Sequence, residues 1–345
     1  MGSFRYAPIL KAKQGEKIAL RHVPAAQWPH MQPIIEVLRA HGEVKPHVDS
    51  LAKDLKKANG DQWPFAIDTR YLSSKGNPAK NVAAVCAYLS KQGLEVCPVI
   101  AADMVSGLAA EMSKLSQYAS IILRIPIGAT SATQIQGLIS AISKEFPKPK
   151  PSIHLVLDFE AIVGAEPKAL EAWADPYVKE ALSAPGPESV TIAGGSFPYN
   201  LVGFAQGAHF LPRVEWQAWQ LLRKKYPDVL FGDYAVTNPA PLEDLDPTQI
   251  NPSAAIRYAL SGRWMLLKGG GTRTSGFAQY NQLCKLLVAS PHYSGPTFSY
   301  GDERYQYHAQ SGSKSGNLSS WRCDATSHHL AFTARECASL FGVSI

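Results

Sequence analysis

The chain has 345 residues, of which 46% are hydrophobic and 18% charged, with a formal net charge of +6 and a pI near 8.9. This composition supports a sizeable core and excludes a globally disordered chain. The mildly basic balance permits a phosphate-bearing partner without requiring one, and no apolar run is long enough to span a membrane. The five cysteines form no CxxC pair, which is typical of reduced thiols in a cytoplasmic protein.

Eight short apolar segments alternate with longer helix-like segments up to residue 234. The predicted strands are Pro8–Lys13, Ile34–Arg39, Phe65–Arg70, Val96–Ala101, Ile121–Ile125, Ile153–Phe159, Val190–Gly194 and Val229–Tyr234. Between them, segments such as 81–93 and 213–226 place apolar residues at i, i+3 and i+4, as amphipathic helices do. Strands this apolar are buried on both faces, which is typical of parallel sheets. The pattern predicts an α/β fold, a (β/α)8 TIM-like barrel, with an open doubly wound sheet as the alternative.

The repeating pattern stops after residue 234. A Pro- and Asp-rich loop covers residues 236–252, and residues 255–273 predict a hairpin around a Ser-Gly turn. Residues 277–290 predict a helix, and residues 290–328 form a Gly-, Ser- and Tyr-rich tract with many turn residues. We expect a barrel core over residues 1–240 and a C-terminal extension of the same domain over residues 241–345. The extension has too few hydrophobic residues for an independent core and should pack on the barrel.

The predicted strands often end in charged residues. The residues in question are Lys11, Lys13, Glu36, Asp68, Arg70, Arg124, Asp158, Glu160 and Asp233, and Tyr234 follows the last of them. Because the carboxyl ends of all strands in a parallel barrel meet at one face, these side chains are predicted to line one polar cup. The alternative for any single residue is a buried ion pair, such as Arg124 with Asp158. For the whole set we favour a ligand site, because each buried charge without a partner costs several kcal/mol.

The carboxylates in this set are candidates for metal binding and catalysis. Glu36, Asp158 and Asp233 are predicted to bind a hard divalent cation, Mg²⁺ or Mn²⁺, although no fixed metal-ligand spacing is present. Asp158, Glu160 and Asp233 are the candidate catalytic acids. A metal together with cationic side chains that hold phosphate is the arrangement used in phosphoester hydrolysis. The interleaved basic residues also balance the carboxylates without any metal.

Two glycine-containing segments are candidates for binding phosphate. Residues 193–198, AGGSFP, follow the seventh predicted strand, where barrels often bind phosphate, and offer Gly195 and Ser196. The alternative is an ordinary tight turn. Residues 266–273, LLKGGGTR, contain Lys268 but lack the spacing of a P-loop, and we predict a loop over the cup.

Two other side chains are candidates for chemistry. His328 and His329 are adjacent in WRCDATSHHL, residues 321–330, and would point opposite ways on a strand, so we expect one, His328, to act as a general acid or base. A solvent-facing or core histidine is the alternative. Lys11 on the first strand also raises a weaker alternative, a Schiff base with pyridoxal phosphate.

Several segments together resemble the beta-protein family, a group of phage-encoded and bacterial proteins often encoded near mobile or defence genes. They are YAPILKAKQGEKIAL, QPIIEVLRA, GSFP, FGDYAVTNP, IRYALSGRWMLLKGGG, YGDERY and WRCDATSHHL. The resemblance runs over nearly the whole chain. It implies a single barrel-like domain and a bacteriophage or antiviral-defence setting, and it implies no activity and no catalytic residue.

The first functional hypothesis is a cytoplasmic barrel protein that binds a phosphate-containing ligand, a nucleotide or a nucleic acid, and acts as a metal-dependent hydrolase. The alternative is a non-catalytic protein that captures a nucleotide signal or a protein partner. A nucleic-acid-coating role ranks third, because the Lys and Arg residues are not clustered in a stripe.

Overall fold

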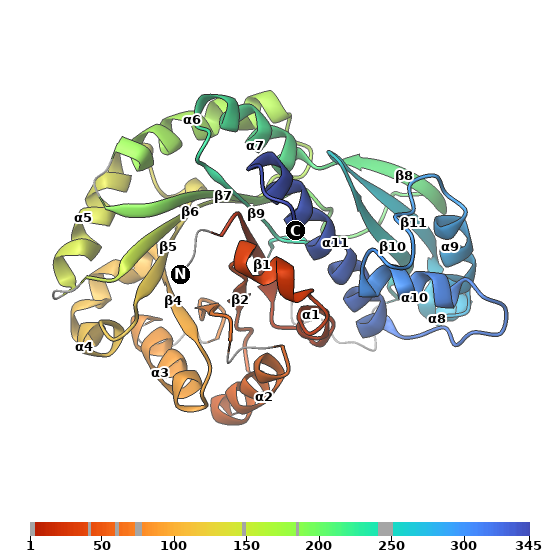
Figure 1. Cartoon of the computed structure of the whole chain (residues 1–345), viewed down its shortest axis with the longest axis horizontal. Helices are drawn as coiled ribbons and strands as arrows, with labels where there is room; N and C mark the ends of the chain where they lie inside the picture. Colours follow the sequence, from red (N-terminus) through yellow and green to blue (C-terminus); the bar gives the residue numbers. More distant parts are fainter. Residues whose placement is uncertain are drawn as a thin grey trace.

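The computed structural model describes residues 4–40, 43–58, 62–72, 78–146, 150–183, 186–240 and 251–345. Its larger part is a closed barrel of parallel strands in the order β1-β2-β3-β4-β5-β6-β7-β9 (Figure 1). These strands are β1 (Tyr6–Lys11), β2 (Ile34–Glu36), β3 (Phe65–Asp68), β4 (Val96–Ala101), β5 (Ser120–Pro126), β6 (Ser152–Ala161), β7 (Pro187–Gly195) and β9 (Leu230–Asp233). Each segment predicted as a strand is a barrel strand. The barrel prediction is confirmed, and the open doubly wound alternative is wrong.

Helices follow the strands and cover the outside of the barrel (Figure 1). They are α1 (Gln14–Leu20), α2 (Val44–Lys56), α3 (Pro78–Lys91), α4 (Met112–Leu115), α5 (Ile135–Glu145), α6 (Pro167–Ser183) and α7 (Val214–Lys225), with short 3-10 turns η1 (Ala25–His30), η2 (Ala102–Gly107), η3 (Ala109–Glu111), η4 (Ile127–Ala129) and η5 (Ala132–Gln134). Each amphipathic helix buries one apolar face. In α2, for example, Val48, Leu51 and Leu55 are buried, which matches the helical period.

The two faces of each barrel strand bury different side chains. On β5, Leu123 packs in the layer between strands and helices, whereas Ile122 belongs to a small cluster inside the barrel. That inner cluster consists of Phe4, Ala7, Ile9, Ile34, Ala66, Cys97, Val99, Ile122, Val156, Ala193, Leu230 and Tyr234. Two residues further along several of these strands the inward positions become charged. The apolar filling of the barrel therefore ends below a polar layer at the carboxyl ends of the strands.

A second, antiparallel sheet in the order β10-β11-β8 combines two strands of the C-terminal extension with one strand from before residue 240. The strands are β8 (Gly207–Pro212), β10 (Ser253–Leu260) and β11 (Arg263–Gly271), and the extension also contains α8 (Thr272–Ser275), α9 (Gln279–Val288) and α10 (Tyr300–His308). The predicted hairpin and the predicted helix at 277–290 are confirmed. Because β8 pairs with β11, strand pairing crosses the predicted boundary at residue 240. The sequence pattern gave no sign of β8.

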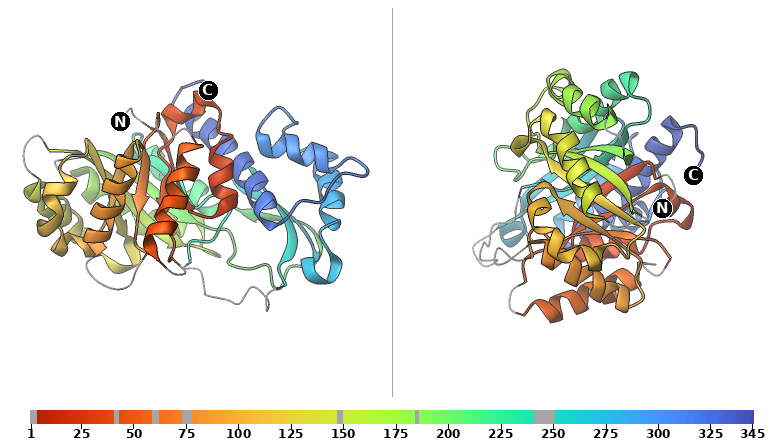
Figure 2. Two further views of the ribbon diagram at one scale, coloured as in Figure 1. Left: turned by 90° about the horizontal axis from the view of Figure 1, so that it is seen from below. Right: turned by 90° about the vertical axis from the view of Figure 1, so that its left-hand side faces the viewer.

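The long helix α11 (Leu318–Leu340) lies between the barrel and the second sheet (Figures 1 and 2). Every residue from Cys323 to Ala331 is buried, so the helix is enclosed on nearly all sides. Two glycines allow neighbouring helices to approach it closely. A Cβ on Gly15 of α1 would lie 2.5 Å from the Ser319 carbonyl oxygen, and one on Gly301 of α10 would collide with the Asp324 carbonyl.

We expect Gly301→Ala to destabilise the protein by about 1–3 kcal/mol, because the new methyl group overlaps backbone that cannot move without shifting α11. Urea denaturation measures the change. The matched control is Gly137→Ala in α5, where the Cβ meets nothing within 4 Å. That control should gain roughly 0.5–1 kcal/mol from helix propensity. Equal stability of the two variants would contradict the packing described for α11.

Candidate functional site

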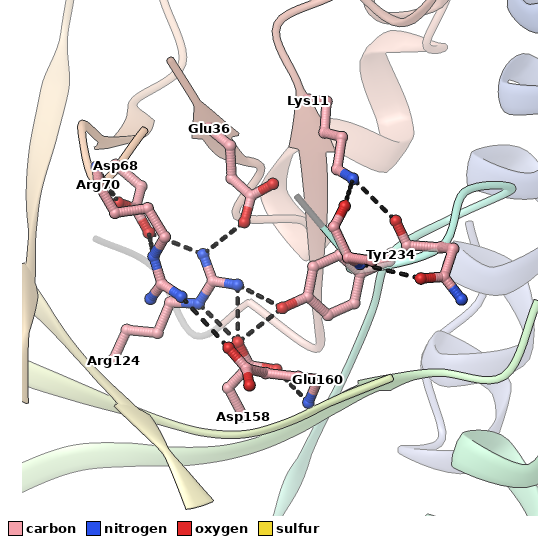
Figure 3. A network of polar contacts seen from close by, with 10 residues as sticks. Lys11, Glu36, Asp68, Arg70, Arg124, Asp158, Glu160 and Tyr234 are labelled. Atoms are coloured by element: carbon pink, nitrogen blue, oxygen red, sulfur yellow. Dashed lines mark hydrogen bonds and ion pairs between the residues drawn. The ribbon is translucent and has the colours of Figure 1, made fainter. Parts of the chain in front are cut away.

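The polar layer lies at the carboxyl ends of the barrel strands, as predicted. Lys11, Glu36 and Asp68 are register neighbours on β1, β2 and β3, and all three are buried. Arg124 follows Ile122 on the inner face of β5, and Asp158 follows Val156 on β6. We call Lys11, Glu36, Asp68, Arg70, Arg124, Asp158, Glu160 and Tyr234 the cup (Figure 3).

Arg124 is the centre of the cup and is 0% exposed. Its Nη1 donates to Glu36 Oε1 at 2.9 Å and to Asp68 Oδ2 at 2.7 Å. Its Nε donates to Asp158 Oδ2 at 2.8 Å, and its Nη2 contacts the same oxygen at 2.6 Å and also Tyr234 (Figure 3). The Tyr234 hydroxyl in turn donates to Asp158 at 2.6 Å. One guanidinium thus connects strands β2, β3, β5 and β6 with the residue after β9.

The pKa values of two carboxyl groups in the cup, Glu36 and Asp68, are shifted in opposite directions. Burial raises the pKa of Glu36, and Arg124 only partly offsets this. For Asp68, burial works in the same direction, but the charges of Arg70 and Arg124 outweigh it and hold the pKa below its usual value. Asp68 is therefore ionised at neutral pH, and Glu36 takes up a proton more readily than Asp68 does.

Aspartates near the carboxyl ends of three strands also stabilise the backbone that follows them. Asp68 and Asp233 end β3 and β9, and Asp158 precedes the irregular end of β6. Asp68 and Asp158 each accept a hydrogen bond at 2.9 Å from the backbone N–H two residues later, and Asp233 does so at 3.0 Å. A short carboxylate in this position caps an exposed amide and lets the chain turn sharply away from the strand. This local role is part of the reason why the strands end in acids.

Backbone strain is concentrated beside the same strand ends. Among the described residues, the non-glycine residues with a left-handed backbone are Glu160, with φ of +51°, and Ala235, with φ of +46°. Glu160 lies in an irregularity of the β6–β7 pairing between Asp158 and Ala161, and Ala235 directly follows Tyr234. Strain of this kind and bulged strands are common beside binding sites.

Some polar atoms of the cup have no hydrogen-bond partner within the described chain. They are Glu36 Oε2 and Arg70 Nη2, and both are buried. Arg70 Nε donates to Asp68 at 3.0 Å, and its Nη1 lies 3.8 Å from Glu160 Oε1. The Glu160 side chain is 50% exposed, so it connects the buried cluster with solvent. A buried polar atom without a partner calls for an explanation, and a bound ligand is one.

Lys11 joins the cup to the segment after β9. Its amine donates to the Asn238 carbonyl at 2.9 Å and to the Ala240 carbonyl. Asn238 in turn donates to the Phe197 carbonyl at 2.8 Å. Lys11 thus holds this segment against the barrel. The pyridoxal phosphate alternative would use the same amine, which here is hydrogen-bonded to backbone carbonyls. No strand or helix pattern singled out Asn238.

Asp233 does not lie in the cup. It points to the outer side of the barrel, where its Oδ1 accepts from the Tyr6 hydroxyl at 2.7 Å and its Oδ2 lies 2.7 Å from His329 Nε2. Tyr234, its neighbour on the strand, takes the inward position because successive side chains alternate. His329 and Arg213 outweigh the effect of burial and lower the pKa of Asp233.

The structure does not bring the predicted metal ligands Glu36, Asp158 and Asp233 together. Glu36 and Asp158 both pair with Arg124, which occupies the position between carboxylates where a cation was expected. Within the described residues, no group of three or more His, Cys, Asp or Glu side chains is arranged to hold a metal ion. The prediction of this metal site is therefore wrong, and charge balance by Arg124 is the physical reason.

The two predicted phosphate-binding segments are used by the protein itself. The Ser196 N–H donates to Glu215 at 3.1 Å, and the Ser196 hydroxyl donates to the Pro212 carbonyl. Gly195 gives room to the Pro239 ring, which a Cβ would approach to 2.7 Å. Lys268 lies on β11 and donates to the Phe204 carbonyl at 2.7 Å, so the expected loop over the cup is a strand of the second sheet.

His328 is buried in α11 and does not belong to the cup, so its position does not fit the general acid or base predicted from the sequence. The segment 321–330 is helical, so the expectation that the two histidines lie on a strand is wrong. His328 Nδ1 lies 2.9 Å from Asp302 Oδ2, its Nε2 lies 3.0 Å from the Ala259 carbonyl, and its ring stacks on Tyr258. Both ring nitrogens face acceptors, which identifies a packing role for this residue.

Lys13 lies outside the cup and lines a separate cavity with Arg257 and Arg322. These two arginines come from β10 and α11, in parts of the chain whose sequence pattern gave no sign of convergence. The five cysteines are all free, and all of them are buried. None of the described helices combines the length and hydropathy needed to cross a membrane.

Comparison with known proteins adds one decisive finding. A model of the Beta protein family matches residues 6–335, which is nearly the full chain. The chain belongs to the Beta protein family. This match confirms the family resemblance noted from the sequence. A search of curated proteins gave no match.

Solved structures that resemble this family member do so only distantly. The Paramecium bursaria Chlorella virus arginine decarboxylase bound to agmatine is 12% identical, with a TM-score of 0.33, over 68% of this chain and 65% of that one, just under two thirds of its length. A GH18 chitinase from Pseudoalteromonas aurantia is 11% identical, with a TM-score of 0.30, over 66% and 92% of the two chains. Fructose-bisphosphate aldolase from Campylobacter jejuni is 10% identical, with a TM-score of 0.31, over 99% and 90%.

We expect Arg124→Met to cost about 3–5 kcal/mol of stability, because Glu36, Asp68 and Asp158 lose their common buried counter-ion. Arg124 lowers the pKa of Glu36 and of Asp68, so without it the folded-state pKa of both rises above the unfolded value, and stability falls as pH rises through that interval. The loss should therefore be smaller at pH 5 than at pH 8. Chemical denaturation at both pH values measures it, with the exposed Arg263→Met as control. A loss that is the same at both pH values, or near zero, would contradict this account.

Proposed function

We propose that this Beta protein family member binds a small phosphate-containing ligand, such as a nucleotide, in the cup. The observation that supports the proposal most strongly is that strained backbone and unpartnered buried polar atoms occur at one place. The strained residues Glu160 and Ala235 directly flank the strand ends that bring Asp158 and Tyr234 to Arg124. Natural structures tolerate strain and unmet hydrogen bonds mainly where a ligand or a reaction uses them.

Arg70 is the cation best placed to hold a phosphate oxygen. Arg124 and Lys11 already direct their donors to protein acceptors, whereas Arg70 Nη2 has no hydrogen-bond partner among the residues that the structure describes. An arginine fork is well suited to phosphate, and a charge-assisted hydrogen bond is stronger than a neutral one. Glu36 Oε2 and the half-exposed Glu160 would accept hydrogen bonds from sugar hydroxyls or base amino groups of the same ligand.

Glu160 supports a second candidate function, hydrolysis of a phosphoester. Burial and the neighbouring Asp158 raise the pKa of Glu160, while half of its side chain reaches solvent. A carboxyl group with a raised pKa at the edge of a site is suited to general acid or base catalysis. In this version Glu160 accepts a proton from an attacking water, and Asp158 positions Arg124 and Tyr234 without contacting the substrate.

The proposal for the setting follows from the family resemblance alone. A bacteriophage or antiviral-defence role, a cytoplasmic location, and a nucleotide signal or protein as partner stay predictions. The non-catalytic alternative uses the same cup and the same ligand contacts, and it differs only in the absence of turnover.

Binding to the cup is tested by titrating AMP, ATP and ribose 5-phosphate, with calorimetry and thermal unfolding as readouts. A ligand that binds the folded state raises its stability by about 2.7 kcal/mol at 100 times Kd. We expect Arg70→Gln to weaken binding roughly 10- to 100-fold, as loss of a charge-assisted hydrogen bond predicts. The exposed Arg263→Gln is the matched control and should bind as the unmodified protein does.

Glu160→Gln separates the two functions. A hydrolase would keep its ligand and lose turnover about 100- to 10,000-fold, measured as phosphate release. A binding protein would release no phosphate with or without the substitution. If none of the three ligands stabilises the protein, or if Arg70→Gln binds them as tightly as the unmodified protein, the proposed cup site is wrong.

A further inference from the structure

A second polar cavity lies outside the cup, where the start of α1, strand β10 and helix α11 meet. Its volume is about 310 Å³, at the lower end of the range for small-molecule pockets. Basic side chains from three separate segments line it: Lys13 after β1, Arg257 on β10 and Arg322 on α11. Such an arrangement requires the complete fold, because these residues are far apart in the sequence.

The three cations lack charge partners within the described part of the chain. None of them forms an ion pair there. Arg257 Nη1 donates to the Val236 carbonyl at 2.6 Å, and its guanidinium lies over the Phe197 ring at 4.6 Å, which leaves its other nitrogens for the cavity. Arg322 is held by its stem, since its Cβ and Cγ pack directly against the backbone of Gly15.

The charges of these side chains oppose one another. Burial and the proximity of Arg322 lower the pKa of Lys13, and the same two causes lower the pKa of Arg257 to about 9. Lys13 is exposed and Arg257 and Arg322 are partly buried, so the three like charges repel one another across a cavity that solvent reaches. An anion bound there would offset this repulsion.

Among the described residues, the carboxyl that acts on Lys13 and Arg257 is Glu16, and it does not supply that anion in full. Glu16 on α1 is 1% exposed, and both of its oxygens lack a hydrogen-bond partner in the described chain. Burial raises the pKa of Glu16 to about 7, although Arg322 and Lys13 pull it down. At neutral pH it is therefore incompletely ionised, and an excess of positive charge faces the cavity.

We propose that the cavity lined by Lys13, Arg257 and Arg322 binds a phosphate group, either inorganic phosphate or the phosphomonoester of a small molecule. Two arginines from different elements can hold separate oxygens of a tetrahedral anion, and the lysine adds a third positive charge. The stacked rings of Tyr280 and Trp321, 4.1 Å apart, form an aromatic wall of the same cavity. That wall offers an apolar surface to whatever small organic group carries the phosphate.

The proposal does not rest on the ligand site in the cup. Lys11 at the end of β1 belongs to the cup, and Lys13 two residues later belongs to this cavity, so each site receives one cation from this part of the chain. The two sites use different arginines, Arg70 in one and Arg322 in the other. Variants of these residues therefore test them separately.

The test is calorimetric titration of the full chain with inorganic phosphate and with AMP, at constant ionic strength set by chloride. We expect saturable phosphate binding that Arg322→Gln weakens at least tenfold. Arg322→Lys keeps the stem against Gly15 and should lose less. Lys285→Gln, at an exposed lysine on α9, is the matched control and should bind within twofold of the unmodified protein. Tighter binding of AMP than of phosphate would identify a phosphomonoester as the ligand class, and equal binding would identify free phosphate.

Two outcomes would overturn the proposal. One is the absence of saturable phosphate binding to the unmodified protein. The other is binding that Arg322→Gln leaves unchanged while both Arg322 variants unfold at the normal temperature. Arg70→Gln should bind inorganic phosphate normally. In that second outcome, loss of phosphate binding in Arg70→Gln would show that the phosphate binds in the cup and that the cavity has no such role.

Discussion

The structure depends on one buried arginine. Arg124 brings a single positive charge to the inside of the barrel, where Glu36, Asp68 and Asp158 would otherwise face one another without water. Its planar group has enough donors to reach all three carboxylates and the Tyr234 hydroxyl, which a lysine could not do. The barrel therefore closes over a balanced ionic layer, and the apolar filling below it can remain small.

This layer also limits what chemistry the cup offers. Because Arg124 and Lys11 direct their donors to protein atoms, the groups left for a ligand lie at the edge, at Arg70 and Glu160. Acidic strand ends are thus partly structural, since Asp68 and Asp233 cap the turns after β3 and β9, and Asp158 caps an amide in the irregular end of β6. The sequence alone does not distinguish the possible roles of such an aspartate. The contacts in the folded chain decide whether it caps an amide, balances a charge or binds a ligand.

The barrel could be predicted because its signal is local. Runs such as Ile121–Ile125 show burial on both faces directly, and all eight segments of this kind are strands. The site could be predicted less well from the sequence, because the side of the sheet that a residue faces depends on register. Asp233 and Tyr234 are neighbours, yet one faces the helices and the other the barrel interior. The convergence of Arg257 and Arg322 arises from packing between β10 and α11, which no local pattern records.

Helix α11 has a consequence for how the chain is made. His329, Thr333 and Glu336, close to the C-terminal end, bind Asp233 and Arg213, which belong to the barrel and to the start of α7. Until α11 has been synthesised, Asp233 and Arg213 lack these partners, and the second sheet lacks the helix that lies between it and the barrel. The polar contacts around Asp233 are therefore completed late during synthesis, and a chain that stops before α11 would present an incompletely packed barrel to chaperones and proteases.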